Sequence, residues 1–427
     1  MDHSQTYALY LPKGYPAARS YPCIYFFDAH ARGSLPVRIY KDIAERYGFV
    51  LVGSNNSQNG AAWPETNELV KTMMEDSRGR INIDPKRVYT SGFSGGSRVA
   101  ASVAIFNGGI AGVIGCAAGF PQVQQAIQRK FDYVGIAGNH DFNFSEMAQL
   151  DNTLEQNGFQ HQLITSNGMH GWPNAADLET AVLWLQINAI KEHLQPANET
   201  LVGAIKRDYD NRIAAAMAAK DWITAHDLAA GAVRVLNGVG DVSIFRKQLA
   251  EMETAGYKDA VARQAKLAQA EQEQQQEVQS QFAGQNDKWL SEKIKQLNKS
   301  AEHAGTPQEA QMNGRVLSYL EFVAYMYTDH ALKAGDPASA SKYLAIFKQA
   351  GPKNPDGGYL KAICSIQKGD HAGAIAALNE AASLGYDEVA KLIKDPAFSS
   401  VANDEGFKRI VQLVRENYTS RRVSDLH

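Results

Sequence analysis

Residues 90–97 read Thr90-Ser91-Gly92-Phe93-Ser94-Gly95-Gly96-Ser97, and this segment is the most informative about the fold. An apolar, β-branched run at 87–90 precedes the glycines, and an alanine-rich helical pattern at 98–106 follows them. A strand is therefore expected to turn sharply into a helix at Ser94. A residue in such a turn has a strained backbone, so its neighbours Gly92 and Gly96 need almost no side chain.

Gly-x-Ser-x-Gly between a strand and a helix is typical of the nucleophile elbow of α/β-hydrolases. In that turn the serine hydroxyl projects beyond the end of the sheet. The next backbone N–H, here that of Gly95, faces the oxyanion that develops on the substrate. The alternative is a glycine-rich turn in which Ser94 has no chemical role, and the residues farther along the chain decide between the two.

Short apolar runs alternate with helical patterns from residue 6 to about residue 195. Near-continuous apolar strands separated by helices predict an α/β fold, with a mostly parallel sheet covered on both faces. Reactive groups gather beyond the carboxyl ends of such strands. The expected strands are 6–11, 23–27, 49–53, 87–92, 111–117, 133–138 and 161–166, and the expected helices are 37–47, 65–80, 95–106, 122–129, 144–156 and 175–194.

The character of the chain changes near residue 196, where strand patterns give way to helix-forming sequence. We therefore expect an α/β-hydrolase catalytic domain over 1–197 and an all-α domain over 198–427. A polar, glutamine-rich stretch in the second part predicts a long solvated helix at about 258–282.

An internal repeat occurs in the second part, where Gly335-Asp336 and Gly369-Asp370 are 34 residues apart. Alanine lies four residues after each aspartate and leucine eight residues after it, and a weaker copy begins at Lys220-Asp221. This period is similar to that of tetratricopeptide (TPR) repeats, in which small residues let paired helices pack closely. An ordinary helical bundle is the alternative.

Two further residues lie just past strand ends in the order that a catalytic triad needs. Asp141 follows the expected strand 133–138, and His170 lies on a glycine-flanked loop after 161–166. Serine, acid and histidine occur in this order in α/β-hydrolases. We expect His170 to be the general base and Asp141 the residue that orients it. His140 is the chief rival of His170, and Asp132 lies at the opposite end of its strand.

Together these residues resemble an esterase group that contains feruloyl esterases and polyhydroxybutyrate depolymerases. The resemblance covers about residues 6–195 and rests on the lead-in Asp84-Pro85-Lys86-Arg87-Val88-Tyr89, the elbow, Asp141 and His170-Gly171-Trp172-Pro173. It implies a serine esterase that works through an acyl-enzyme intermediate without a cofactor or metal. The implied substrates are feruloyl, acetyl or polyester-type esters.

The chain departs from this group at the loop that should complete the oxyanion hole. The group has His-Gly after an early strand, whereas this chain has Asp28-Ala29-His30-Ala31. The resemblance implies that a backbone N–H of Ala31 acts together with that of Gly95, while Ala29 and His30 stay open as alternatives. The residues expected to contact substrate are His30, Asn56, Trp63 and Trp172.

The short spacings between Ser94, Asp141 and His170 leave no room for a large lid. An open cleft favours bulky or polymer-attached esters as substrates. We also expect the helical repeats to present a surface for a protein or polysaccharide partner, because stacked helix pairs form extended concave surfaces. A stabilising or dimerising role for the repeats is the alternative.

The overall composition excludes several classes of protein. A formal net charge of -3 without a basic stripe argues against nucleic acid as a partner. Cys23, Cys116 and Cys364 are too scattered to indicate a metal site or a disulfide framework. No apolar run approaches the ~20 residues of a membrane span. No signal-peptide pattern precedes the first strand, which leaves both a cytosolic protein and a periplasmic or secreted protein with a trimmed leader open.

Two other functions stay open beside the esterase. One is a serine peptidase of the same fold, although such peptidases usually carry a propeller domain before the hydrolase, and here the first strand pattern begins near residue 6. The other is a pseudo-hydrolase without activity, whose repeat domain binds a partner. The altered oxyanion loop favours this second alternative, and the presence of Ser94, Asp141 and His170 argues against it.

Overall fold

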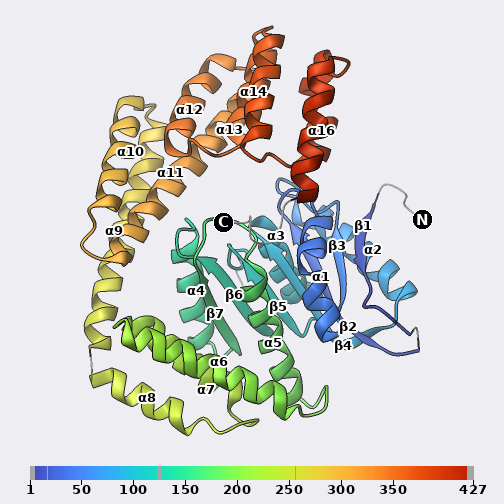
Figure 1. The fold of residues 1–427 in the computed structure, drawn as a ribbon, viewed down its shortest axis with the longest axis vertical. Helices are drawn as coiled ribbons and strands as arrows, with labels where there is room; N and C mark the ends of the chain where they lie inside the picture. The colour runs from blue at the N-terminus through green and yellow to red at the C-terminus, as the bar shows by residue number, and fades with distance from the viewer. Residues whose placement is uncertain (1–4, 17, 123–126, 255, 421–427) are drawn as a thin grey trace. The chain divides into compact units, whose positions relative to one another are not determined.

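The computed structural model describes residues 5–16, 18–122, 127–254 and 256–420. Contacts divide the chain into two compact units, one through Ala265 and one from Lys266 onward. Figure 1 shows an α/β unit followed by helices alone. The fold class expected from the sequence, an α/β-hydrolase sheet followed by an all-helical part, is confirmed.

The first unit is built on a seven-stranded sheet in the order β1-β3-β2-β4-β5-β6-β7. Only the edge strand β1 runs antiparallel to its neighbour, and the other pairs are parallel. The strands are β1 Tyr7–Tyr10, β2 Tyr21–Asp28, β3 Val50–Ser54, β4 Ile83–Phe93, β5 Gly112–Cys116, β6 Asp132–Gly138 and β7 His161–Ser166. Each expected strand is therefore present, with ends that differ by a few residues.

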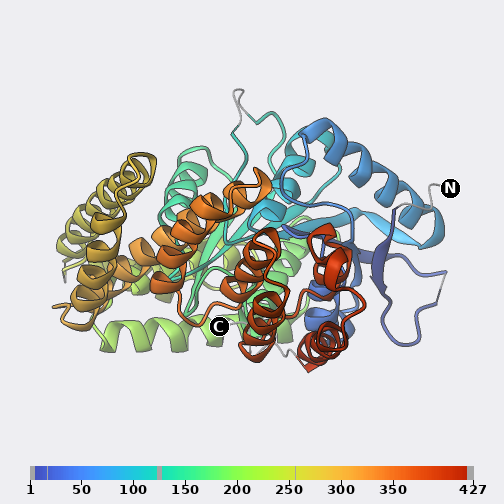
Figure 2. The ribbon, with the colours of Figure 1, turned by 90° about the horizontal axis from the view of Figure 1, so that it is seen from above.

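The strands are buried on both sides because helices cover both faces of the sheet (Figure 2). On β2, Tyr25 and Phe27 belong to the core on the α2–α3 face, whereas Phe26 packs against Tyr40 of α1 on the other face. This alternation is the period of two that a strand imposes on its side chains. The helices are α1 Ser34–Tyr47, α2 Trp63–Arg80, α3 Gly95–Ser102, a π-helix Val103–Asn107, α4 Phe144–Gln156 and α5 Ala175–Lys191.

Two helix predictions differ from the structure. The helix expected at 95–106 is α-helical only to Ser102 and continues as a π-helix to Asn107. The helix expected at 122–129 falls partly on residues 123–126, which lie outside the described residues, and residues 127–129 are not helical.

Three further helices belong to the first unit, although the sequence placed them in a second domain. They are α6 Glu199–Ala218, α7 Trp222–Leu236 and α8 Ser243–Thr254. The Tyr209 hydroxyl donates to Gln162 Oε1 of β7 at 3.1 Å, and Arg234 Nη1 donates to Glu155 Oε2 of α4 at 2.9 Å. The contact-based division lies between residues 265 and 266, whereas the sequence predicted a boundary between residues 197 and 198.

The second unit is helical throughout its described residues. Its helices are the end of α9 Tyr257–Ala283, α10 Asp287–Glu302, α11 Pro307–Lys333, α12 Pro337–Ala350, α13 Asp356–Gln367, α14 His371–Ser383, α15 Val389–Lys394, a 3-10 helix Pro396–Val401 and α16 Glu405–Ser420. Helix α9 covers the glutamine-rich stretch expected at about 258–282. It is not wholly solvated, because Glu271 is fully buried and paired with Arg315 of α11 at 2.7 Å.

The repeated Gly-Asp pairs mark one kind of helix-to-helix turn. Gly335 and Gly369 take a left-handed conformation with φ of 70° and 78°, and the following aspartates cap α12 and α14. The same turn occurs at Lys220-Asp221 and at Gln285-Asn286, where the left-handed residue is not glycine. The sequence repeat is therefore a local turn motif, and the assignment to tetratricopeptide repeats stays a prediction.

Candidate active site

Ser94 lies in a strained turn between β4 and α3, as the flanking glycines predicted. Its φ of 55° and ψ of -121° are unfavourable for a residue with a side chain. A Cβ atom on Gly92 would lie 2.1 Å from the Gly96 carbonyl oxygen, and one on Gly96 would lie 2.1 Å from the Phe27 carbonyl oxygen. Both positions therefore require glycine, because the atoms they would strike belong to the backbone.

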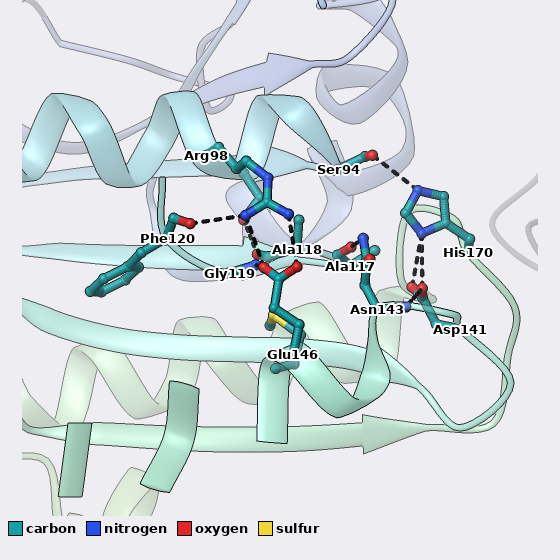
Figure 3. Close-up of polar contacts among 12 residues, drawn as sticks. Ser94, Arg98, Ala117, Ala118, Gly119, Phe120, Asp141, Asn143, Glu146 and His170 are labelled. Carbon is teal, nitrogen blue, oxygen red and sulfur yellow. Dashed lines mark hydrogen bonds and ion pairs between the residues drawn. The ribbon is translucent and has the colours of Figure 1, made fainter. Parts of the chain in front are cut away.

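The structure brings the three residues of the expected triad together (Figure 3). Ser94 Oγ lies 3.0 Å from His170 Nε2, and His170 Nδ1 lies 2.9 Å and 3.1 Å from the two carboxylate oxygens of Asp141. Asp141 is fully buried, and the backbone N–H of Asn143 also donates to it at 2.8 Å. Because a carboxylate accepts the Nδ1–H, the Nε2 lone pair is left to accept the serine proton.

The loop that carries His170 is held against the loop after β6. The backbone N–H of His140 donates to the Gly168 carbonyl at 3.0 Å. A Cβ atom on Gly138 would lie 2.3 Å from the same carbonyl oxygen, so glycine is required at the end of β6. The His140 ring contacts its neighbour, with Nδ1 2.7 Å from Asn139 Oδ1. His170, and not its rival His140, contacts Ser94.

Two phenylalanines flank the imidazole of His170. The Phe142 ring stacks on it with centroids 4.3 Å apart, and the Phe93 ring lies 4.9 Å away. Phe93 is buried and directly precedes Ser94. These two rings restrict the orientation of the imidazole.

An ion pair that sequence reasoning missed holds the loop after β5 (Figure 3). Arg98, one turn after Ser94, makes two hydrogen bonds of 2.8 Å to Glu146 of α4. Arg98 also donates to the Phe120 carbonyl at 2.9 Å, and Glu146 accepts the Gly119 N–H at 2.8 Å. No local pattern pairs residues 48 positions apart, so only the fold reveals this contact.

The expected oxyanion groups have different surroundings. Gly95 is the first residue of α3, where backbone N–H groups have no partner within the helix. The Ala31 N–H, in contrast, donates to the Asp28 carbonyl at 3.2 Å, and the His30 N–H donates to Asp28 Oδ1 at 2.8 Å. Both N–H groups therefore close a turn on Asp28, and the assignment of the second donor to Ala31 stays a prediction.

Two of the four residues expected to contact substrate also make contacts within the protein, a third is buried, and a role in substrate binding stays a prediction for all four. Asn56 Oδ1 accepts the Thr6 N–H at 2.8 Å, and Trp63 packs against Phe106 with centroids 5.7 Å apart. Trp172 is buried, with only 3% of its surface exposed. The fourth residue, His30, is exposed and forms an isolated bridge with Gln58.

Groups of histidine, cysteine and carboxylate side chains that could hold a metal ion are absent from the described part of the chain. The three cysteines are buried and free, and burial raises the pKa of both Cys23 and Cys116 well above the usual range of a thiol. None of the helices over the described ranges is long and apolar enough to cross a bilayer.

Neither a family model nor a curated protein matches this chain. Among solved structures it is similar to the S-formylglutathione hydrolase of Staphylococcus aureus, with 12% identity and a TM-score of 0.37 over 42% of this chain and 90% of that chain. It is also similar to a ferulic acid esterase, with 14% identity and a TM-score of 0.35 over 42% of this chain and 88% of that one. A thermophilic esterase of Thermogutta terrifontis has 14% identity and a TM-score of 0.35 over 44% and 86%. By name these neighbours are one hydrolase and two esterases, and a similarity this low does not establish the chemistry of this chain.

Proposed function

We propose that this chain is a serine hydrolase that cleaves carboxylic esters through Ser94, His170 and Asp141. The observation that carries the proposal is the continuous chain of hydrogen bonds from Ser94 Oγ through the imidazole to a fully buried carboxylate. A strained φ such as that of Ser94 and a buried carboxylate such as that of Asp141 both cost stability. Both features are typical of sites of nucleophilic catalysis.

In the proposed reaction, Ser94 Oγ attacks the ester carbonyl while His170 Nε2 takes the serine proton. Asp141 stabilises the imidazolium that forms and keeps the ring in its orientation. The N–H of Gly95, at the positive end of α3, donates to the oxyanion. We propose that the second donor also comes from the turn at 29–31, where Ala29 is the alternative to Ala31 and His30, whose N–H groups donate to Asp28. The alcohol leaves with the proton from His170, and water, activated by the same imidazole, then releases the acid.

Within this class we propose feruloyl, acetyl or polyester-type esters as substrates. The support is the resemblance of the motifs at the elbow and at His170, together with the two phenylalanine rings beside the imidazole. Aromatic rings at the site suit a bulky or aromatic acyl group. A serine peptidase is the nearest other chemistry, and an anilide substrate offered beside the matching ester distinguishes the two.

The test is to compare matched pairs of variants on p-nitrophenyl and hydroxycinnamoyl esters. His170→Ala should lower kcat/KM by on the order of 10³ or more, whereas His140→Ala, one loop away, should lower it by less than about threefold. Ser94→Ala should abolish both turnover and labelling by a fluorophosphonate, while circular dichroism shows an unchanged fold. If Ser94→Ala keeps wild-type turnover, the serine mechanism is excluded. If wild-type protein reacts with neither ester nor fluorophosphonate, the pseudo-hydrolase reading replaces the esterase.

A further inference from the structure

Asp28 carries a buried charge that the proposed reaction does not use. It is the last residue of β2, and none of its surface is exposed. Its carboxylate accepts four hydrogen bonds: from the His30 N–H at 2.8 Å, from Arg32 Nε at 2.8 Å, from Arg32 Nη2 at 3.1 Å and from Trp172 Nε1 at 2.8 Å. A buried carboxylate is costly unless its lone pairs are satisfied in this way, so the site is built around the charge.

The bond to Trp172 determines where the His170 loop can lie. His170 follows the edge strand β7, and Ser94 follows β4, three strands away or about 14 Å at the usual strand spacing. The loop therefore has to cross the ends of β6 and β5. Two residues after His170, Trp172 reaches β2, which lies one strand beyond β4. Asp28 thus anchors the loop on the far side of the serine.

Packing transmits the position of Trp172 to the imidazole. The Trp172 ring lies 5.9 Å from Phe93, whose ring is in turn 4.9 Å from His170. The next residue is also held, because the Tyr40 hydroxyl donates to the Pro173 carbonyl at 2.7 Å. The ring centroids of Tyr40 and Trp172 lie 6.0 Å apart, so Tyr40 contacts both residues.

The same carboxylate shapes the turn on the other side of the site. The Arg32 guanidinium and the His30 N–H hold residues 29–32 around Asp28, and Ala31 takes a φ of 58° as a result. The Asn59 N–H donates to the Ala29 carbonyl at 2.9 Å and fixes the outer edge of this turn. In our proposal this turn supplies an oxyanion donor.

We infer that Asp28 is a positioning residue, which holds the His170 loop and the 29–32 turn in one arrangement around Ser94. The inference rests on the proposed function and extends it. It also gives a role to the aspartate that ends β2, because its carboxylate accepts hydrogen bonds from both segments at once.

The Asp28 carboxylate stays ionised over the pH range in which an imidazole acts as a base. Burial alone would raise the pKa of Asp28, but the charge and hydrogen bonds of Arg32, with smaller contributions from His30 and Trp172, hold it below its usual range. The carboxylate is therefore ionised throughout the range in which histidine exchanges protons.

The experiment compares Asp28→Asn and Trp172→Phe with a matched control in the full chain. Asp28→Asn removes the charge and keeps the shape, and Trp172→Phe removes the indole N–H and keeps an aromatic ring. The control is Asp84→Asn at the start of β4, because Asp84 also pairs with an arginine, Arg87, at 2.7 Å, but at the opposite end of the sheet. All three are assayed at low temperature on p-nitrophenyl acetate and for phosphonylation of Ser94 by a fluorophosphonate.

We expect Asp28→Asn to lower kcat by about 100-fold and Trp172→Phe by about 10-fold, with KM changed by less than about threefold, since small displacements of a catalytic group have effects of this size. Asp84→Asn should match wild type. The proton on His170 Nδ1 should give a low-field NMR resonance in wild type, which shifts or broadens in the first two variants and not in the control.

Three results would overturn the inference. Unchanged kcat and an unchanged resonance in both variants would show that Asp28 only stabilises the fold. A raised KM at constant kcat would place it in substrate binding instead. If Asp28→Asn fails to fold, a wild-type kcat in Trp172→Phe would by itself refute the positioning role of Asp28. If wild type hydrolyses no ester, the proposed function fails first, and the NMR comparison then decides whether Asp28 positions His170.

Discussion

Asp132 allows a quantitative test of how burial affects stability, because it is a buried acid at the end of the sheet opposite to Ser94. It begins β6, and 8% of its surface is exposed. Burial, with a smaller contribution from the nearby Glu192, raises its pKa from 3.8 to about 7, although Asn188 and Lys191 act in the other direction. Asp141, the proposed triad acid, follows the other end of the same strand.

The sign of the effect follows from proton binding. In the unfolded chain Asp132 ionises near pH 4, whereas in the folded chain it keeps its proton to about pH 7. The unfolded state therefore binds fewer protons between these values, and the free energy of unfolding falls as pH rises through this window. A shift from 3.8 to about 7 corresponds to at most about 4 kcal/mol above pH 7, and relaxation around the charge reduces this to about 2–4 kcal/mol.

Asp132→Asn should remove this penalty and keep the side-chain shape. We expect its melting temperature to exceed that of wild type by on the order of 5–10 °C at pH 8, and by clearly less at pH 5, where folded wild type is still protonated. Differential scanning fluorimetry at the two pH values measures both differences. Turnover of p-nitrophenyl acetate should be unchanged, because the residue is remote from Ser94.

An equal stabilisation at pH 5 and pH 8, or none at either, would refute the reasoning. It would mean that Asp132 is ionised in the folded protein or that water reaches it. A loss of turnover in Asp132→Asn would contradict the view that Asp132 lies remote from Ser94, at the end of β6 opposite to Asp141. Asp141→Asn is the matched comparison, and it should lose on the order of 10³ in kcat without the gain in stability at pH 8.

Two further predictions concern the helical parts. Arg315→Met should lower the free energy of unfolding of the second unit by about 3–5 kcal/mol, because Glu271 would stay buried without its partner. The double variant Glu271→Leu with Arg315→Met should recover most of that loss. Denaturant titration measures both free energies, and an unaffected single variant would show that water solvates the pair. A fragment of residues 1–265 should fold and hydrolyse small esters. A fragment of residues 1–197 should melt at a lower temperature, because it loses the contacts of Tyr209 and Arg234 with Gln162 and Glu155. Equal melting temperatures for the two fragments would support a domain boundary near residue 197.

Much of the catalytic half could be predicted from the sequence, because the signals are local. An apolar run with glycines at fixed offsets has few backbone solutions, so residues 90–97 alone predict a strand, a strained serine and a helix. Parallel strands leave their carboxyl ends at one edge of the sheet, and residues just past two of those ends, Asp141 and His170, meet Ser94 there.

The helical half was less predictable, because one motif serves several arrangements. A left-handed residue followed by an N-capping side chain joins helices at Gly335-Asp336 and equally at Lys220-Asp221, where no glycine signals it. Helix propensity also does not say on which surface a helix packs. Helices α6 and α7 therefore looked separate in sequence, although hydrogen bonds join α6 to Gln162 of β7 and α7 to Glu155 of α4.

Periodicity, turn chemistry and chain order thus predict the fold class and the three residues proposed for bond cleavage, because each of these signals is local. Which buried polar groups face one another depends instead on the three-dimensional arrangement of the strands. Asp28 and Trp172 are 144 positions apart, and Ala31 loses its N–H to a turn that no pattern announces. Such pairs depend on the order of strands in the sheet, and a carboxylate withdrawn from water has to take whatever donors that order brings within reach.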